Sequence, residues 1–472
     1  MKKRWLAVWS LACAGMGLFV SSMAATAAPA SSAPAYSAAV TSAYAKRMQW
    51  FADAKFGVFI HWGIYSVDGI TESWSFYDGW VPYPIYMQQL KGFTASNYHP
   101  QAWADLIKAS GARYAVLTSK HHDGVALWPT KHGLNVVKDT PAGRDLVGPF
   151  VKALRKDHLK VGLYFSLIDW SYKDYPAHTH TQTRYRIKDD PARWQRFVTY
   201  YQDQVHDLTN RYHPDLYWFD GGWEHTAAQW HSKQLRQWIL AHNPGAIMNS
   251  RLTGYGDYGT PEQGVPIARP PYKYWELCLT MNNSWGWQPT DHHFKTPDQL
   301  IRILADTAGM GGNLLLDIGP RADGSIPQIE QTTLRQIGQW LSRNGKAIYG
   351  TVAGIPKNYY AGSSTLSKDR KTLYLFVDGN PEGPILVKGL MNRIVRARVV
   401  GSGMILDTQR VGATLGTAPA LLYIKLPQSV LDPQHVTAIA LDLDGPIKLY
   451  RDTARPKPLD PGEPTMRAPQ AQ

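Results

Sequence analysis

Asp220 closes an apolar, aromatic run, "LYWFD", and two glycines follow it. An ionised carboxylate at the end of a buried strand is costly unless neighbouring groups compensate it. Because strand side chains alternate, Leu216, Trp218 and Asp220 share one face, and Gly221 and Gly222 let the backbone turn away. We interpret Asp220 as a reactive carboxylate at the mouth of a sheet. A structural carboxylate bonded to amides or to an arginine is the competing interpretation.

Two glutamates could act as the partner of Asp220. Hydrolysis of a glycosidic bond normally needs a nucleophilic or basic carboxylate and a second carboxyl group that protonates the leaving oxygen. Glu262 lies in the Gly/Pro-rich segment "GYGDYGTPEQG", which predicts a loop above the sheet. Glu276, between Trp275 and Leu277, is expected on a strand and in a structural role. We therefore favour Glu262 as the acid/base and keep Glu276 as the runner-up.

Three histidines also follow strand-like runs: His61 opens "HWG", and His121 and His122 lie in "KHHDG". Adjacent strand residues face opposite sides, so His121 and His122 reach one pocket only if the strand ends there, which Asp123-Gly124 favours. Neutral imidazoles suit binding of sugar hydroxyls. Metal binding is the alternative, but no third ligand has diagnostic spacing, so we expect no metal.

The elements that must position these groups alternate between strands and helices. Parallel strands followed by amphipathic helices predict an α/β fold. We expect strands at Phe56–His61, Tyr114–His121, Val161–Asp169, Leu216–Asp220, Ala246–Arg251 and Asn313–Gly319. We expect helices at Pro100–Ser110, Asp145–Asp157, Pro191–Tyr212 and Ala227–His242.

Polar residues stand at the carboxyl end of nearly every expected strand. A barrel gathers all its strand ends around one mouth, whereas a doubly wound open sheet spreads them along a line. We therefore predict an irregular (β/α)8 TIM-like barrel over residues 43–350, with two strands that loops obscure. Short β-rich runs separated by Gly, Pro, Asn and Asp predict a C-terminal antiparallel β-sandwich over 351–450. A Pro-rich tail, 451–472, is expected to be disordered.

The N-terminus has a basic start, an apolar stretch and an Ala25-Thr26-Ala27 cleavage pattern, which predict a signal peptide over residues 1–27 and a spacer over 28–42. An uncleaved membrane anchor is less favoured because the apolar stretch is short. We expect export to a bacterial periplasm or exterior, without membrane insertion after cleavage. Cys278 is then the only cysteine, so no intramolecular disulfide forms.

Composition argues against a nucleic-acid partner. The formal charge is +13, and three of these charges lie in residues 1–27. The remaining basic residues are scattered, which indicates a solvated basic surface rather than a nucleic-acid site. Aromatic residues make up 12% of the chain, a density that suits sugar stacking as well as core packing.

Taken together, several motifs resemble secreted α-L-fucosidases of glycoside hydrolase family 29. They span most of Trp50 to about Tyr349 and read "KFGVFIHWGIYSV", "LTSKHHDGVALW", "GLYFSLIDW", "YWFDGGW", "TPEQG", "NNSWGW" and "GGNLLLDIGPRADGSI". The resemblance implies a barrel followed by a β-sandwich, and retaining hydrolysis of terminal α-L-fucose from a fucosylated glycan without a cofactor.

The resemblance also assigns site residues. It implies Asp220 as nucleophile and Glu262 as acid/base, with Glu276 as the alternative because the acid/base varies in the family. The residues that it implies for sugar binding are His61, Trp74, His121, His122, Tyr164, Arg251 and Trp285. Many members have an adjacent Glu-Trp pair, but this chain reads "TESWSF", with Ser73 between Glu72 and Trp74. Glu72 is therefore either displaced or lost from the sugar site, and only Trp74 is carried over.

Two other functions remain open at this stage. An α-L-galactosidase would share the fold and mechanism and would accommodate a hydroxymethyl group where fucose has a methyl. A secreted, non-catalytic fucose-binding protein could use the same aromatic and polar groups. The paired carboxylates argue against a pure binder, which does not need them. The sequence predicts no particular oligomeric state.

Overall fold

The computed structural model describes residues 38–412, 419–432 and 435–451. The chain divides into two units at Ala43/Tyr44, and nearly all described residues belong to the second, Tyr44–Gln472. The expected signal peptide and most of the expected tail lie outside the described residues. Helix α1 (Ala38–Ala54) begins inside the segment expected to be a spacer.

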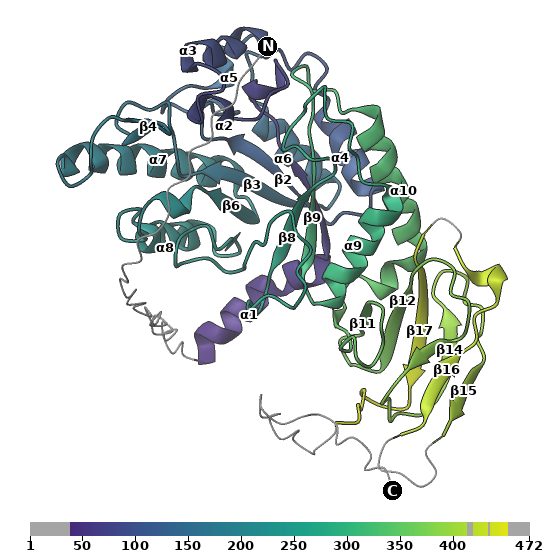
Figure 1. The fold of residues 1–472 in the computed structure, drawn as a ribbon. Coiled ribbons are helices and arrows are strands. Elements are labelled where there is room, and N and C mark those ends of the chain that lie inside the picture. Colours follow the sequence, from purple (N-terminus) through teal and green to yellow (C-terminus); the bar gives the residue numbers. More distant parts are fainter. Residues whose placement is uncertain (1–37, 413–418, 433–434, 452–472) are drawn as a thin grey trace, which may run out of the picture. The chain divides into compact units, whose positions relative to one another are not determined.

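A seven-stranded parallel sheet forms the first part of the second unit (Figure 1). Its strands lie in the order β7-β6-β3-β2-β1-β9-β8, so β1 pairs both with β2 and with β9, the last strand of this sheet in sequence. The bounds are β1 Phe56–Ile60, β2 Tyr114–Lys120, β3 Lys160–Ser166, β6 Leu216–Asp220, β7 Ile247–Met248, β8 Glu276–Thr280 and β9 Asn313–Ile318. All six expected strands are confirmed, and β8 is one of the two that loops obscured.

Residues 258–262 occupy the remaining gap between β7 and β8. Isolated parallel bridges join Asn249 to Tyr258 on one side, and Gly259 to Trp275 and Glu262 to Cys278 on the other. The sheet therefore curls round to an irregular barrel, as predicted, with its eighth position held by single bridges rather than by a full strand. The open doubly wound sheet is excluded.

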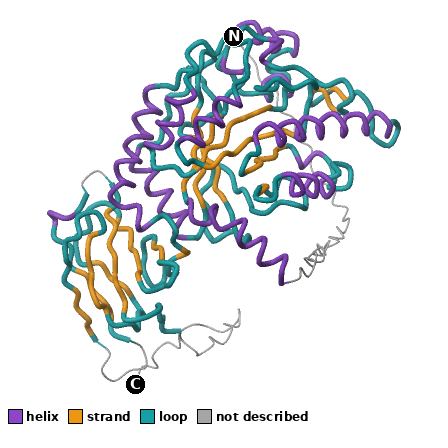
Figure 2. The backbone as a smooth tube through the Cα atoms, turned by 180° about the vertical axis from the view of Figure 1, so that it is seen from behind, coloured by secondary structure: helices purple, strands orange, loops and turns teal. Residues whose placement is uncertain are grey.

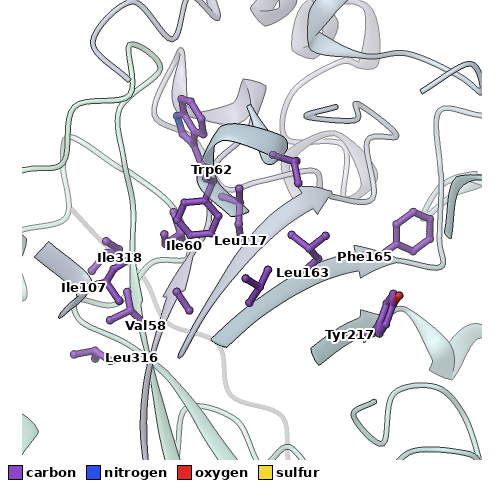
Figure 3. Close-up of a cluster of buried hydrophobic side chains, with 14 of the residues drawn as sticks. Val58, Ile60, Trp62, Ile107, Leu117, Leu163, Phe165, Tyr217, Leu316 and Ile318 are labelled. Atoms are coloured by element: carbon purple, nitrogen blue, oxygen red, sulfur yellow. The ribbon is translucent and has the colours of Figure 1, made fainter. Parts of the chain in front are cut away.

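The two faces of the sheet carry different cores. Phe59, Tyr164, Trp218 and Leu315 belong to a cluster inside the barrel, together with Met48 and other residues of α1. Figure 3 shows the alternate residues, which form the cluster between the sheet and its covering helices; among them are Val58, Ile60, Leu117, Leu163, Tyr217 and Leu316. The alternation expected for Leu216, Trp218 and Asp220 is therefore confirmed.

Helices follow most strands and cover the outer face, as the purple coils beside the orange strands show (Figure 2). Each of them buries an apolar side. The long ones are α4 Pro100–Ala109, α6 Val147–Lys156, α7 Pro191–Tyr212, α8 Ser232–His242, α9 Pro297–Gly309 and α10 Gln328–Asn344. Helix α8 begins later than expected because His231 adopts a left-handed conformation, with φ of 51°.

Shorter elements decorate the loops after the strands. They include α2 Trp74–Tyr77, α3 Tyr83–Tyr86, α5 Val136–Asp139 and the hairpin of β4 Ala177–Thr179 and β5 Gln182–Thr183. Helix α2 follows β1 and carries Trp74 at its first residue. These loops lie at the carboxyl ends of the strands, where barrel enzymes build their sites.

Two antiparallel sheets form the C-terminal part, which confirms the β-sandwich. One is β10-β11-β12-β17-β14 and the other is β13-β16-β15, and a separate apolar cluster fills the space between them. The bounds are β10 Val352–Ala353, β11 Ser364–Leu366, β12 Thr372–Val377, β13 Ile385–Val387, β14 Ile394–Val399, β15 Thr408–Val411, β16 Leu421–Ile424 and β17 Thr437–Leu443. Trp340 of α10 donates its indole N–H to the Val436 carbonyl and so ties the sandwich to the barrel helices.

Candidate active site

A cavity of about 560 Å³ opens where the parallel strands end. Of the residues expected at the site, only His122 and Glu276 are not on its lining. The lining consists of Phe59, His61, Glu72, Trp74, His121, Tyr164, Trp218, Asp220, Trp223, Arg251, Glu262 and Trp285. Segments as far apart in the chain as residues 59 and 285 therefore meet around one space.

Asp220 is held by a preformed set of donors. Its Oδ2 accepts a hydrogen bond from the Tyr164 hydroxyl at 2.8 Å, and its Oδ1 accepts one from Nη1 of Arg251 at 2.7 Å. His122 Nε2 lies 3.5 Å from Oδ2. The Asp220 side chain is 10% exposed, so it is mostly buried but open to the cavity. The hydrogen bonds from Tyr164 and Arg251 compensate the cost of the buried charge.

The two glycines after Asp220 are needed for close packing. Gly221 has φ of +81°, and a Cβ there would lie 2.5 Å from the Ile168 side chain. A Cβ on Gly222 would lie 2.0 Å from the carbonyl oxygen of Arg251. The turn after β6 can therefore approach the Arg251 segment only with glycine in these places.

Arg251 joins the two candidate carboxylates. Its Nη1 contacts Asp220, and its Nη2 lies 2.5 Å from Oε2 of Glu262. The guanidinium also lies over the Trp218 ring, 4.4 Å from its centroid. Burial disfavours the charge of Arg251, but the carboxylates, chiefly Asp220, outweigh this and raise its pKa. Asp220 and Glu262 thus lie on one guanidinium, 42 positions apart in sequence.

Glu276 lies beneath the cavity. It is fully buried on β8, where Oε1 accepts from the Trp218 indole N–H at 3.0 Å and Oε2 accepts from the Tyr114 hydroxyl. Burial raises its pKa to about 7. The prediction that Glu276 lies on a strand is confirmed. It contacts the cavity only indirectly, through its hydrogen bond with Trp218, which lines the cavity.

Each of the three histidines is anchored through Nδ1. The distances are 2.6 Å from His61 to Asp317, 2.6 Å from His121 to Ser73, and 2.5 Å from His122 to Ser166. Burial lowers the pKa of all three, that of His61 to about 3, so the imidazoles are neutral at neutral pH. In the part of the chain that the structure describes, no three His, Cys, Asp or Glu residues are arranged to hold a metal ion.

Aromatic rings close one side of the cavity. Phe59 lies 5.0 Å from Trp218 and 6.0 Å from Trp285, measured between ring centroids. Trp285 also packs on His61 at 4.8 Å, and Trp74 meets His122 edge to face at 5.6 Å. Trp223 lines the mouth and is 55% exposed.

Phe59 and Trp223 are lining residues that the sequence did not single out, and Glu72 is one that it left between two alternatives. Glu72 precedes α2, is 2% exposed, and its Oε1 has no hydrogen-bond partner among the described residues. Burial raises its pKa well above the usual range. The inserted Ser73 does not remove Glu72, because a turn there lets Glu72 and Trp74 both reach the cavity while Ser73 bonds His121. Glu72 therefore lines the cavity from a position one residue earlier than in the adjacent Glu-Trp pair.

Comparisons with known proteins agree with this geometry. The family model for α-L-fucosidase matches residues 22–346. The chain is 36% identical over 335 residues to the tissue α-L-fucosidase of Rattus norvegicus, a match that covers 64% of this chain and 70% of the rat protein.

Two solved bacterial structures are similar. One is α-L-fucosidase isoenzyme 1 from Paenibacillus thiaminolyticus, with TM-score 0.77, 33% identity, and coverage of 85% of this chain and all of that one. The other is a family 29 α-L-fucosidase from Bacteroides thetaiotaomicron, trapped as a covalent intermediate with 2-fluoro-fucosyl fluoride. Its TM-score is 0.73 at 26% identity, and the match covers 84% of this chain and 96% of that one. The chain therefore belongs to the α-L-fucosidases of glycoside hydrolase family 29.

Proposed function

We propose that the chain is a retaining exo-glycosidase that removes terminal α-L-fucosyl residues, with Asp220 as nucleophile and Glu262 as acid/base. The observation that carries this proposal is the shared arginine: Arg251 contacts Asp220 at 2.7 Å and Glu262 at 2.5 Å. Two carboxylates held by one guanidinium are close enough to act on the same bond. Retaining enzymes place them roughly 5–5.5 Å apart.

The reaction then proceeds in two displacements. Asp220 attacks the anomeric carbon as the bond from that carbon to the leaving oxygen breaks, and Glu262 donates its proton to that oxygen. In the second step Glu262 takes a proton from water, whose oxygen attacks the anomeric carbon and releases Asp220. Two inversions retain the configuration.

The surroundings suit these roles unequally. Tyr164 and Arg251 hold both oxygens of Asp220, which fixes the attacking group. The Glu262 side chain is 38% exposed. Within the described residues, the only hydrogen bond that this side chain accepts comes from Arg251. Glu262 can therefore exchange that contact for the leaving oxygen when substrate enters.

The aromatic side of the cavity supports fucose rather than galactose. Phe59 and Trp285 provide an apolar corner, and a methyl group at C5 can be buried there at no polar cost. The hydroxymethyl of an α-L-galactoside would leave a hydroxyl without a partner in that corner. We expect kcat/KM for the aryl fucoside to exceed that for the aryl galactoside by about 10²-fold. Equal values for the two aryl glycosides would favour the α-L-galactosidase alternative.

Azide rescue separates the two carboxylate roles. With azide and an activated aryl fucoside, Asp220→Ala should regain turnover and release the β-L-fucosyl azide, the inverted product. Glu262→Ala should release the α-L-fucosyl azide, because azide replaces water in the second step. Glu276→Ala is the matched control and should show no rescue. Rescue of Glu276→Ala instead of Glu262→Ala would transfer the acid/base role to Glu276.

We also propose export of the enzyme. The support is the sequence of residues 1–27, with its basic start, apolar stretch and Ala25-Thr26-Ala27 pattern. No helix in the described ranges is long and apolar enough to cross a membrane. N-terminal sequencing of the protein from a bacterial periplasm or medium should begin at Ala28. A full-length chain retained in the cytoplasm would contradict the proposal.

A further inference from the structure

Two residues of the cavity lining differ from the rest in exposure. Trp223 is 55% exposed, and Glu262, the proposed acid/base, is exposed as well. Among the lining residues that the structure describes, all others are buried or half-buried. A sugar inside the cavity therefore meets buried groups, whereas whatever projects from the cavity meets an indole and the acid/base.

Core packing does not account for Trp223. The other three tryptophans of the lining, Trp74, Trp218 and Trp285, each pack within or against an apolar cluster. Trp223 belongs to none of the apolar clusters that the described residues form. An exposed aromatic ring at the rim of a cavity, with one end apolar and the other in water, is typical of a binding surface.

The Trp223 ring lies beside the side chains that contact the two carboxylates. Its centroid is 6.0 Å from Cζ of Arg251. Arg251 contacts both Asp220 and Glu262. The ring also meets the His122 ring edge to face, with 6.3 Å between centroids. Because the leaving oxygen must reach Glu262, the group attached to that oxygen must pass the mouth where Trp223 lies.

The backbone that carries Trp223 is fixed on both sides. The short 3-10 helix η3 (Gly222–Glu224) follows β6, and two hydrogen bonds reach the Gly222 carbonyl while two reach the Glu224 carboxylate. The donors are the side chains of Trp230, Thr253, Trp170 and Tyr175. A ring held in this way loses little freedom when a ligand binds to it, so its contact area is available at low cost.

We propose that Trp223 is the platform for the sugar that carries the fucose, and that it makes the enzyme favour a pyranose as leaving group. This inference rests on the proposed function. A pyranose with several ring hydrogens on one face can lie on the indole while its hydroxyls stay in water. D-Galactose is such a sugar, because the hydrogens of C3, C4 and C5 lie on one face. Trp223 thus determines specificity for the leaving group.

The first test compares two donors that differ in leaving group. α-L-Fucosyl-(1→2)-D-galactose releases a pyranose, whereas α-L-fucosyl fluoride releases an ion without a ring. Trp223→Ala should lower the ratio of kcat/KM for the disaccharide to kcat/KM for the fluoride roughly tenfold. The loss should appear mainly in KM for the disaccharide, because stacking is present both before and during the reaction. Trp223→Tyr should restore most of the ratio.

Trp80→Ala is the matched control. Trp80 is 67% exposed and is not on the cavity lining, so its replacement should leave kcat/KM for both donors unchanged. A merely structural role for Trp223 would instead lower kcat/KM for both donors alike in Trp223→Ala. An unchanged ratio in that variant would overturn the inference.

The second test follows the fucosyl-enzyme that forms from fucosyl fluoride. An added alcohol competes with water: its hydroxyl oxygen attacks the anomeric carbon, its proton passes to Glu262, and the bond to Asp220 breaks. In the wild type, transfer to D-galactose should saturate as its concentration rises, because galactose first binds on Trp223. Transfer to methanol should rise in proportion to its concentration. In Trp223→Ala, transfer to galactose should fall roughly tenfold relative to transfer to methanol.

Transfer to galactose that does not saturate in the wild type would also overturn the inference. This measurement decides even if Trp223→Ala fails to fold. Failure of the proposed function would show differently, as no release of fluoride from fucosyl fluoride by the wild type.

Discussion

Asp220 and Glu262 reach the same cavity from regions of opposite character. Asp220 ends a regular strand, its side chain is 10% exposed, and both of its oxygens accept hydrogen bonds. Glu262 lies in residues 258–262, which close the barrel by single bridges, and its side chain is 38% exposed. The attacking group needs a fixed position, whereas a group that gives and takes a proton must reach both the leaving oxygen and water. The molecule builds the first on a strand and the second on an irregular segment.

The largest expected effect is the loss of kcat when either carboxylate is replaced, and its dependence on the leaving group should differ between Asp220 and Glu262. Asp220→Ala should lower kcat by on the order of 10⁴-fold or more for every fucoside. Glu262→Gln should cost roughly 10²- to 10⁴-fold on fucosylated oligosaccharides, because their leaving oxygen needs a proton. Fucosyl fluoride needs less assistance, so its first step should be nearly normal in Glu262→Gln. A uniform loss across leaving groups would show that Glu262 is not the acid.

The bridging arginine should show the next effect. Arg251→Lys keeps a charge but cannot hold both carboxylates with one planar group. We expect kcat/KM to fall about 10- to 100-fold, corresponding to the roughly 1.5–3 kcal/mol of a charge-assisted hydrogen bond. Arg302→Lys is the matched substitution, because Arg302 lies on α9, is half-buried and also forms an ion pair, with Asp298, and it should leave kcat/KM unchanged. An unchanged kcat/KM in Arg251→Lys would mean that the bridge is not used.

A pair of glycine substitutions tests the difference in packing. A Cβ at Gly222 would lie 2.0 Å from the Arg251 carbonyl, whereas nothing lies within 4 Å of a Cβ at Gly264, two residues after Glu262. Gly222→Ala should lower the free energy of unfolding by roughly 1–3 kcal/mol and also reduce turnover. Gly264→Ala should do neither. Denaturant titration with the aryl fucoside assay measures both, and equal effects would remove the contrast.

The last effect is confined to the pH dependence of stability and concerns Glu276, which lies beneath both groups. Burial raises the pKa of Glu276 to about 7, above its value of 4.5 in an unfolded chain. The folded state therefore binds a proton more tightly, so this group's contribution to stability is present below pH 4.5 and is lost as pH rises to about 7. Glu276→Gln should remove roughly 3 kcal/mol of that pH dependence. Thermal unfolding curves at pH 5 and 8 that shift in parallel for both proteins would contradict this.

Sequence patterns predicted most of what lies on regular elements. Leu216–Asp220 shows alternation and ends in a carboxylate, so its strand and its inward face could be inferred. Because parallel strands end at one mouth, His61, His121 and Arg251 were expected near Asp220 without knowledge of any contact. The aromatic packing around Phe59 was not expected, since a buried Phe on a strand is usually core.

Irregular segments were harder to predict, for physical reasons. Residues 258–262 lack apolar alternation, so their role as the eighth barrel position depends on neighbours that lie far away in sequence. The short strands β10, β11 and β15 carry too few residues for a periodic signal. The position of Glu72 depends on how the chain turns at Ser73. The hydrogen bond between Ser73 and His121 is a tertiary contact that local sequence does not encode.

The most direct measurement is the site of covalent labelling. Incubation with 2-deoxy-2-fluoro-α-L-fucosyl fluoride should slow the second step more than the first and accumulate the fucosyl-enzyme. Peptide mapping by mass spectrometry should then find one 2-fluorofucosyl group, attached to Asp220, and the label should be absent from Asp220→Ala. A label on Glu262 or Glu276, or release of β-L-fucose as the first product, would contradict the account.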